Sequence, residues 1–181
     1  MDGTPLTAHS HAEIHLFCRA TPCPVCGRGP LESQDPHEEC GQTVGHTATV
    51  RVLCKACREP SEFSFRLPPD PPPDPAGELE IISPTEEPSR IIDVSQWITL
   101  YAVLHEESAR TSAQPRKRLL ELQAGQCLDE ALKFFDDEEN DLPPPSAFFD
   151  DSARNRFRNQ PQEFSRQRLI NFRAALPQPL G

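Results

Sequence analysis

The sequence is poor in the residues that build a large hydrophobic core. Hydrophobic residues make up 36% of the 181 residues, and the chain has one tryptophan, one tyrosine and one methionine. No apolar run approaches the roughly 18–20 residues that a transmembrane helix needs, so we predict no membrane span. Because the chain also contains 21 prolines, two small modules joined by a polar connector fit this composition better than one large domain.

The sequence also lacks a positive charge balance and a targeting segment. Its formal net charge is −10, which disfavours generic nucleic-acid binding because most of the chain would repel a phosphate backbone. The first ten residues contain neither the basic nor the apolar region of a signal peptide, so we expect a cytoplasmic protein. In a reducing compartment the seven cysteines are expected to be thiols and metal ligands before disulfides.

Common catalytic motifs are absent as well. The chain has no glycine-rich phosphate loop, no G-x-S-x-G and no H-E-x-x-H, and we therefore predict that it is not an enzyme. An acidic run at 136–141 lacks the spacing and the central glycine of an EF-hand loop. We expect a solvated helix end there or, as an alternative, a docking surface for a basic partner.

Strand-like alternation marks the first third of the chain. Apolar and polar residues alternate near 12–19, 47–54 and 62–67, and this period of two is typical of half-buried strands. The polar stretch 31–46 is expected to be a loop. These features predict a small antiparallel β module over residues 11–67.

A proline-rich segment then separates this module from a helical one. Six of the eight residues in 68–75 are proline, which forbids both helix and sheet and favours a semi-rigid spacer. With the acidic residues that follow, we expect a linker over 68–90. The predicted fold class is α+β, with a helical domain at 91–177.

Four helices are predicted in that domain. Asp93 and Gln96 have the spacing of a capping box, which opens a helix over about 93–110 with Trp97 and Tyr101 in its core-facing stripe. A second helix is expected from about Pro115 to 137. Ser146 could cap a third helix, and Pro161 suits the first turn of a fourth.

Two C-x-x-C motifs carry the most specific signal in the chain. Cys23-Pro-Val-Cys26-Gly and Cys54-Lys-Ala-Cys57 each follow a predicted strand. Such turns can aim two sulfurs at one ion, and two turns complete the tetrahedral shell of a structural Zn²⁺ site. A β module of this size cannot bury enough apolar surface to be secure alone. We therefore predict a structural zinc ion held by Cys23, Cys26, Cys54 and Cys57.

Other chemistries remain open for the remaining thiols and histidines. A thioredoxin-like redox motif would stand at the N-terminus of a helix, but no helical pattern follows either C-x-x-C motif. A reversible disulfide switch that ejects zinc is an alternative. Cys40 could replace one ligand, with His37 nearby. Cys18 and Cys127 are expected to pack in the two cores. The remaining clustered histidines are expected to be solvated, although a second metal site is conceivable; they are His9, His11 and His15.

The motif spacing resembles a zinc ribbon. Cys23-Pro-Val-Cys26-Gly, followed by a second C-x-x-C, is similar to uncharacterised bacterial CpXC-type ribbon proteins, although Cys54-Lys-Ala-Cys57 lacks a proline after its first cysteine. The resemblance covers the N-terminal third of the chain. It implies a ribbon fold and four zinc-ligating cysteines, and it implies no activity.

Function is expected to lie in interaction. The leading hypothesis is a zinc-stabilised adaptor that presents the ribbon to a protein partner. An alternative is a nucleic-acid-binding or transcription-associated regulator that uses the basic C-terminal end, where 143–181 carries a net charge of +3. A thiol redox protein is the third possibility. The arginines of this end are expected to be solvated or to pair within the chain; they are Arg154, Arg156, Arg158, Arg166, Arg168 and Arg173.

Overall fold

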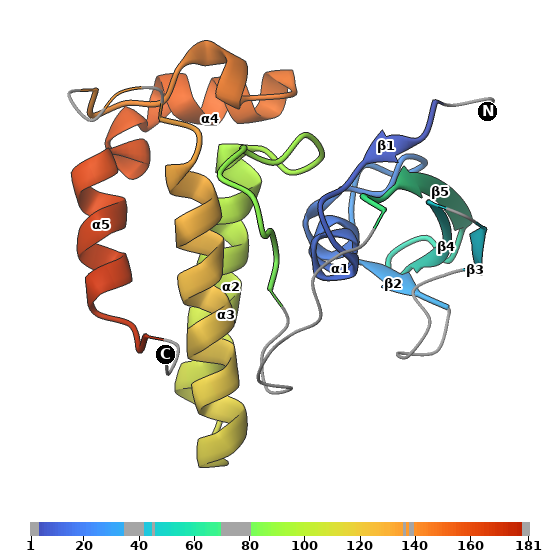
Figure 1. Ribbon diagram of the computed structural model, residues 1–181, viewed down its shortest axis with the longest axis horizontal. Helices are drawn as coiled ribbons and strands as arrows, with labels where there is room; N and C mark the ends of the chain where they lie inside the picture. The colour runs from blue at the N-terminus through green and yellow to red at the C-terminus, as the bar shows by residue number, and fades with distance from the viewer. Residues whose placement is uncertain are drawn as a thin grey trace. The chain divides into compact units, whose positions relative to one another are not determined.

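The computed structural model shows an α+β protein, as predicted, whose chain divides into two compact units. The structure describes residues 4–34, 42–44, 46–69, 81–135, 137 and 140–178. Among these residues, unit 1 contains those up to 69 together with 81–85 and 89–92, and unit 2 contains 86–88 and those from 93 onwards. Figure 1 draws both units with their elements labelled.

Unit 1 begins with a helix where we expected a strand. Helix α1 runs from His11 to Ala20, so the predicted strand at 12–19 is wrong. Ser10 caps the helix, because its side chain accepts a hydrogen bond from the backbone N–H of Glu13. The alternation we noted also contains Ile14, Phe17 and Cys18 at the i, i+3, i+4 spacing of a helix face, and all three are buried.

A mixed five-stranded sheet forms the rest of unit 1. Its strands are β1 (Leu6–Thr7), β2 (Leu31–Ser33), β3 (Gln42–Val44), β4 (Thr47–Cys54) and β5 (Pro60–Arg66). Their order is β1-β5-β4-β2, with β3 also on β4, and only the β1–β5 pair is parallel. The strand predicted at 47–54 is confirmed and the one at 62–67 overlaps β5. The expected loop at 31–46 instead contains β2 and β3, and its other residues from 35 onwards lie largely outside the described part.

The core of unit 1 lies between α1 and the sheet. Phe17 of α1 meets Phe63 and Phe65 of β5 edge-to-face, with 5.3 Å between ring centroids in each pair. On β4, every second residue from Ala48 to Cys54 is buried. These rings and the short aliphatic side chains of β4 form the part of the core that faces α1 and the sheet.

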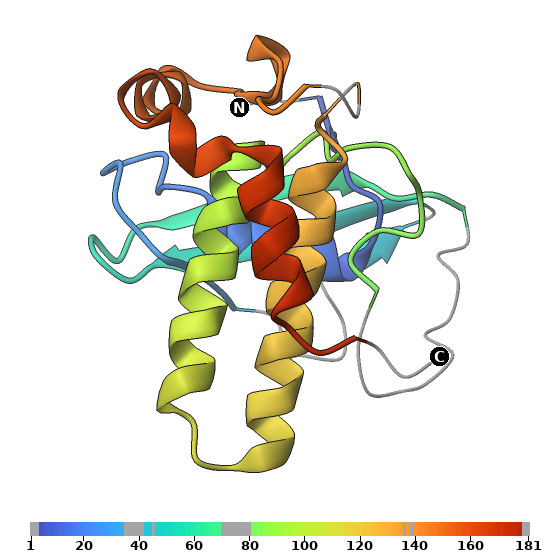
Figure 2. The ribbon, with the colours of Figure 1, turned by 90° about the vertical axis from the view of Figure 1, so that its left-hand side faces the viewer.

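Unit 2 is helical. It contains α2 (Val94–Arg110), α3 (Gln114–Leu132), α4 (Asp151–Asn159) and α5 (Arg166–Ala174), with 3₁₀ turns η1 (Pro145–Ala147) and η2 (Pro161–Phe164). The capping box at the start of α2 is confirmed: Asp93 accepts from the N–H of Gln96, whose side chain accepts from the N–H of Asp93. Figure 2 shows α2 and α3 side by side, joined at one end, with α5 against them.

Two predicted helix starts in unit 2 are wrong. Ser146 lies inside the 3₁₀ turn η1, and Asp150 caps α4 by accepting from the N–H of Ala153. Pro161 begins the 3₁₀ turn η2, and Ser165 caps α5. In each case a proline near the expected start supports only a short turn, and the residue that caps the α-helix lies a few positions later.

Large fully buried side chains fill unit 2. Trp97, Leu104, Leu128, Phe164 and Leu169 are each 0% exposed. Three phenylalanines from η1–α4 and η2 also form one ring cluster, with centroids 4.7–5.4 Å apart; they are Phe148, Phe157 and Phe164. This unit therefore has the aromatic and aliphatic core that unit 1 has in smaller measure.

Candidate metal centre

The structure brings the two C-x-x-C motifs together. The sulfur atoms of Cys23, Cys26, Cys54 and Cys57 all lie within 4.8 Å of one another. The shortest contacts run between the motifs: Cys23 Sγ is 3.7 Å from Cys57 Sγ, and Cys26 Sγ is 3.7 Å from Cys54 Sγ. In the part of the chain that the structure describes, this is the one group of His, Cys, Asp or Glu side chains able to share a metal ion.

The first motif forms a tight turn, which we call knuckle 1 (residues 23–28). The N–H of Cys23 donates to the carbonyl of Arg28, and the N–H of Gly27 donates to the carbonyl of Cys23. Gly27 has a φ of +66°, the left-handed region in which a side chain is strained. The N–H of Val25 also donates to the sulfur of Cys23 at 3.4 Å. Gly27 therefore suits the backbone that reverses the chain after the second cysteine.

The second motif repeats the same turn, which we call knuckle 2 (residues 54–59). The N–H of Cys54 donates to the carbonyl of Glu59, the N–H of Arg58 donates to the carbonyl of Cys54, and the N–H of Ala56 donates to the sulfur of Cys54 at 3.3 Å. Arg58 has a φ of +64°, so an arginine takes the conformation that Gly27 takes in knuckle 1. Sequence reasoning missed this equivalence, because an arginine gives no sign of a left-handed backbone.

The sheet places the two knuckles beside each other. Knuckle 2 is the turn between β4 and β5, and knuckle 1 leads into β2. In the β2–β4 pair, Leu31 lies opposite Cys54, and the N–H of Lys55 donates to the carbonyl of Pro30 at 3.0 Å. The register of one short strand pair thus holds both pairs of sulfurs at the same end of the sheet.

Hydrogen bonds prepare the site for negative sulfur. The pKa of Cys54 is lowered to about 6, first because the backbone N–H of Cys57 donates to its sulfur, an effect that outweighs its burial. The pKa of Cys57 is raised to about 12: the N–H of Glu59 lowers it, but burial and hydrogen bonds with the other three thiols outweigh that effect. Of these two thiols, Cys54 is therefore the first to ionise.

The donor set suits a soft or borderline metal ion with four ligands. Cys23 and Cys54 are buried, and Cys26 and Cys57 are half-buried. Four cysteine sulfurs on two turns satisfy a tetrahedral shell without a solvent ligand. Neither motif opens a helix, since β2 follows the first and β5 the second, so the arrangement that activates a thioredoxin-like thiol is missing here.

The other cysteines and histidines that the structure describes are not part of this cluster. Cys18 on α1 and Cys127 on α3 are buried in their own units, as predicted, whereas Cys40 and His37 lie outside the described residues. The expectation that the N-terminal histidines are solvated is wrong for His9, which is 9% exposed and makes a hydrogen bond with Ser83.

Ser83, His9 and Glu13 have the composition of a catalytic triad without its geometry. Ser83 Oγ lies 3.0 Å from His9 Nδ1, and Glu13 Oε2 lies 4.0 Å from the same nitrogen. A proton relay needs the hydroxyl and the carboxylate on opposite ring nitrogens. These contacts therefore act as a structural connection between two segments of unit 1.

Half of the C-terminal arginines form ion pairs within unit 2. Arg154 pairs with Asp151, Arg156 with Glu163, and Arg173 with Asp129. Arg158 contacts the side chain of Asn155, whereas Arg166 and Arg168 form no ion pair with any residue that the structure describes. In the acidic run at 136–141, Asp136, Glu138 and Glu139 lie outside the described residues.

Comparisons with known proteins assign no family. No family model matches the chain, and no curated protein or solved structure is detectably similar to it. The resemblance to CpXC-type ribbons therefore rests on the cysteine motifs themselves. None of the helices in the described residues is long and apolar enough to cross a membrane.

Proposed function

We propose that this chain is a non-enzymatic adaptor whose N-terminal unit is a ribbon held by one structural Zn²⁺ ion. The observation that carries the proposal is the convergence of four sulfurs within 4.8 Å on two matching knuckles. A shell closed by four cysteines offers no position for a substrate or an activated water molecule. Such a site supplies folding energy to a unit whose own core is small.

The sheet supports the ribbon assignment. Strands β2, β4 and β5 form an antiparallel sheet in which one knuckle precedes β2 and the other joins β4 to β5. Zinc is favoured over Mg²⁺ or Ca²⁺ because those ions prefer oxygen ligands. Helix α1 is an addition to this ribbon, and it covers the sheet through Phe17.

The knuckle tips are the surface that we assign to a protein partner. Val25 is 64% exposed, the most exposed of the large hydrophobic side chains that the structure describes. Arg28 and Arg58 are exposed beside the cysteines and form no ion pair with described residues. Knuckles that carry an exposed apolar side chain and two arginines without ion pairs to described residues fit an acidic protein segment with an apolar anchor.

The adaptor proposal is tested with a matched pair of surface variants. Val25→Glu and Val103→Glu each place a carboxylate at an exposed valine, one on knuckle 1 and one on α2, where Val103 is 46% exposed. We expect cross-linking in cells of the native host to recover a protein with the wild type and Val103→Glu but not with Val25→Glu. Recovery of the same proteins by all three chains would exclude the knuckle as the docking surface.

A second candidate function, nucleic-acid binding, is favoured by one feature of unit 2. Four planar groups from α2 and α5 form a column: His105 stacks on Tyr101, Tyr101 on Phe172, and the guanidinium of Arg168 lies 5.1 Å from the ring of Phe172. Both ends, His105 and Arg168, are exposed. Bases of a single strand can extend such a column, and the unpaired Arg166 could contact phosphate.

Salt dependence separates this candidate from the adaptor. If unit 2 binds a single-stranded oligonucleotide, fluorescence anisotropy should show affinity at low salt that falls steeply as salt rises. Arg168→Ala and Phe172→Leu should both weaken it, whereas Arg154→Ala, which removes a paired arginine, should have little effect. Failure of the wild type to bind at low salt would remove this candidate.

A further inference from the structure

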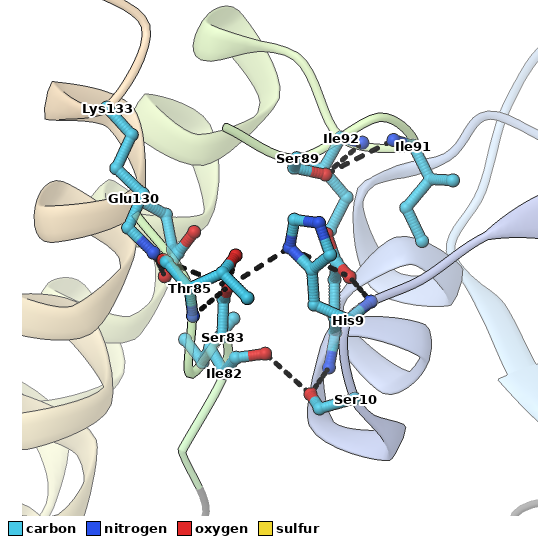
Figure 3. Close-up of polar contacts among 11 residues, drawn as sticks. His9, Ser10, Ile82, Ser83, Thr85, Ser89, Ile91, Ile92, Glu130 and Lys133 are labelled. Carbon is cyan, nitrogen blue, oxygen red and sulfur yellow. Dashed lines mark hydrogen bonds and ion pairs between the residues drawn. The ribbon is translucent and has the colours of Figure 1, made fainter. Parts of the chain in front are cut away.

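Residues 81–92, which we call the strap, are attached to the start of α1. The side chain of Ser10 donates to the carbonyl of Ile82 at 2.5 Å, and Ser83 Oγ lies 3.0 Å from His9 Nδ1. Figure 3 shows both contacts, which join residues more than 70 positions apart in the sequence. Ser10 is also the N-cap of α1, so one side chain both starts the helix and holds the strap.

Both ends of the strap, 81–85 and 89–92, belong to unit 1, whereas 86–88 belong to unit 2. Ile82, Ser89, Ile91 and Ile92 are each at most 6% exposed. The hydroxyl of Ser89 accepts hydrogen bonds from the N–H groups of Ile91 and Ile92, which turns the chain at this point (Figure 3). Ile82, from the region that we predicted as a linker, is thus a buried residue of unit 1, and so are Ile91 and Ile92, which we had placed in the helical domain.

Helix α1 connects the strap to the cysteine cluster. His9 and Ser10 stand before its first turn, and Cys23 follows its last residue, Ala20, by three positions. A ten-residue helix is about 15 Å long, and it joins the strap contacts at its start to Cys23 beyond its end. Glu13, which is 0% exposed, fixes the first turn because its carboxylate accepts from the N–H of His9.

We propose that the strap is a metal-dependent latch: the ion at one end of α1 stabilises the attachment of residues 81–92 at the other. This inference rests on the proposed metal site. When the cysteines are metal-free, Cys23 no longer anchors the end of α1, and the His9 and Ser10 contacts lose their fixed support. The strap ends at Ile92, and the next residue is Asp93, the N-cap of α2. Metal occupancy therefore controls the segment that leads into the helical unit.

Linkage makes the proposal reciprocal. If metal binding strengthens strap attachment by some factor, then loosening the strap must weaken metal binding by the same factor. Ile82→Ala removes a side chain that is 3% exposed in the strap. Ile81→Ala removes the same atoms one residue earlier, where the side chain is 37% exposed, and it is the matched control.

The first measurement is amide hydrogen exchange of the full chain, read by mass spectrometry on peptides from residues 81–92. We expect removal of the metal with a chelator to accelerate exchange in the strap at least about tenfold, because loss of the ion destabilises the unit to which the strap is attached. Peptides from α5 in unit 2 serve as the internal reference. Exchange in the strap that is identical with and without metal would overturn the latch.

The second measurement is metal affinity by competition with a chelating dye. Ile82→Ala should bind zinc at least about fivefold more weakly than the wild type, and Ile81→Ala should match it. Ser83→Ala, which removes only the hydroxyl facing His9, should weaken binding in the same direction if Ile82→Ala does not fold. Wild-type affinity in both strap variants would refute the latch while leaving the metal site intact, whereas a wild-type chain that binds no metal would refute the proposed site itself.

Discussion

Sulfur atoms gather at one end of unit 1, whereas aromatic rings fill unit 2. In unit 1 three phenylalanines contact one another, Phe17, Phe63 and Phe65. Unit 2 has the one tryptophan of the chain, fully buried, together with its own phenylalanine cluster. The two units therefore differ in what stabilises them. In unit 1 the apolar core is small and a shell of metal ligands would add stability, whereas in unit 2 packed helices bury a larger core.

Metal removal should have the largest effect of the changes considered, and it should affect the two units differently. A structural zinc ion contributes roughly 10–16 kcal/mol of apparent binding free energy in small modules, so chelation should unfold unit 1 and leave unit 2 folded. Two-dimensional NMR should show loss of dispersed β-sheet signals, whereas the helical far-ultraviolet circular dichroism of unit 2 should persist.

Serine variants provide the control for that experiment. Cys54→Ser should abolish stoichiometric zinc in the purified protein. Cys127→Ser, at a buried position on α3, should retain one zinc ion per chain. Equal zinc content in the two variants would show that the four-sulfur cluster is not the binding site.

A cavity in the core of unit 2 should destabilise that unit and leave the metal site of unit 1 intact. Leu104 is 0% exposed, so Leu104→Ala should lower the free energy of unfolding of unit 2 by about 2–5 kcal/mol. Urea titration followed by the fluorescence of Trp97, the one tryptophan, measures this. The neighbouring Val103→Ala, at a half-exposed position, should change it by no more than about 0.5 kcal/mol. Loss of bound zinc in Leu104→Ala would show that the two units are not energetically separate.

The two knuckles offer a sharper test within unit 1. Gly27→Ala should destabilise the loaded unit by about 1–2 kcal/mol, because the added Cβ meets no atom within 4 Å and the cost is that of a left-handed backbone alone. Arg58→Gly should stabilise the unit by up to about 1 kcal/mol by relieving the same strain. Denaturation of the cobalt-loaded protein, followed by thiolate–cobalt absorption, reads both changes. Shifts of the same sign would contradict the equivalence of the knuckles.

The smallest effect concerns the start of α2. Burial raises the pKa of Asp93, against the N–H groups of Gln96 and Phe149 that lower it, and the charge of Asp150 adds to the rise. An acid whose folded-state pKa is raised loses stability as pH rises through the interval between its unfolded and folded values. Relative to Asp93→Asn, the wild-type unit 2 should therefore become less stable as pH rises from about 3.8.

Urea titrations from pH 3 to pH 8 would measure that slope. Asp93→Ala, which removes both accepting oxygens, should add a loss of about 0.5–2 kcal/mol at every pH, the usual effect of deleting a helix cap. A stability difference between the wild type and Asp93→Asn that does not change with pH would show that burial does not perturb this carboxyl.

The chemistry of the candidate site could be predicted from the sequence because it is local. Spacing within each C-x-x-C motif and the glycine after Cys26 report a turn directly. The left-handed conformation of Arg58 could not be predicted, since it follows from the pairing of β4 with β5 and not from the arginine. The capping box of Asp93 and Gln96 was equally readable, because both partners lie within one turn.

The prediction of secondary structure failed where a short run of apolar residues fits both the period of a strand and the period of a helix. Residues 12–19 fit both a strand and one face of a helix, and Ser10 with Glu13 three residues later was the overlooked signal of a helix start. The attachment of Ile82 and Ser83 to the start of α1 joins segments more than 70 residues apart, which no local pattern reports. Ser146 and Pro161 were assigned to the starts of α-helices that begin only at Asp151 and Arg166.

The central claim is that four cysteine sulfurs bind one zinc ion. Zinc K-edge X-ray absorption of the purified full-length chain tests it most directly. We predict four sulfur neighbours at about 2.3 Å and no nitrogen or oxygen ligand. A first shell that contains nitrogen or oxygen, or a protein that carries no zinc when its cysteines are reduced, would contradict the account.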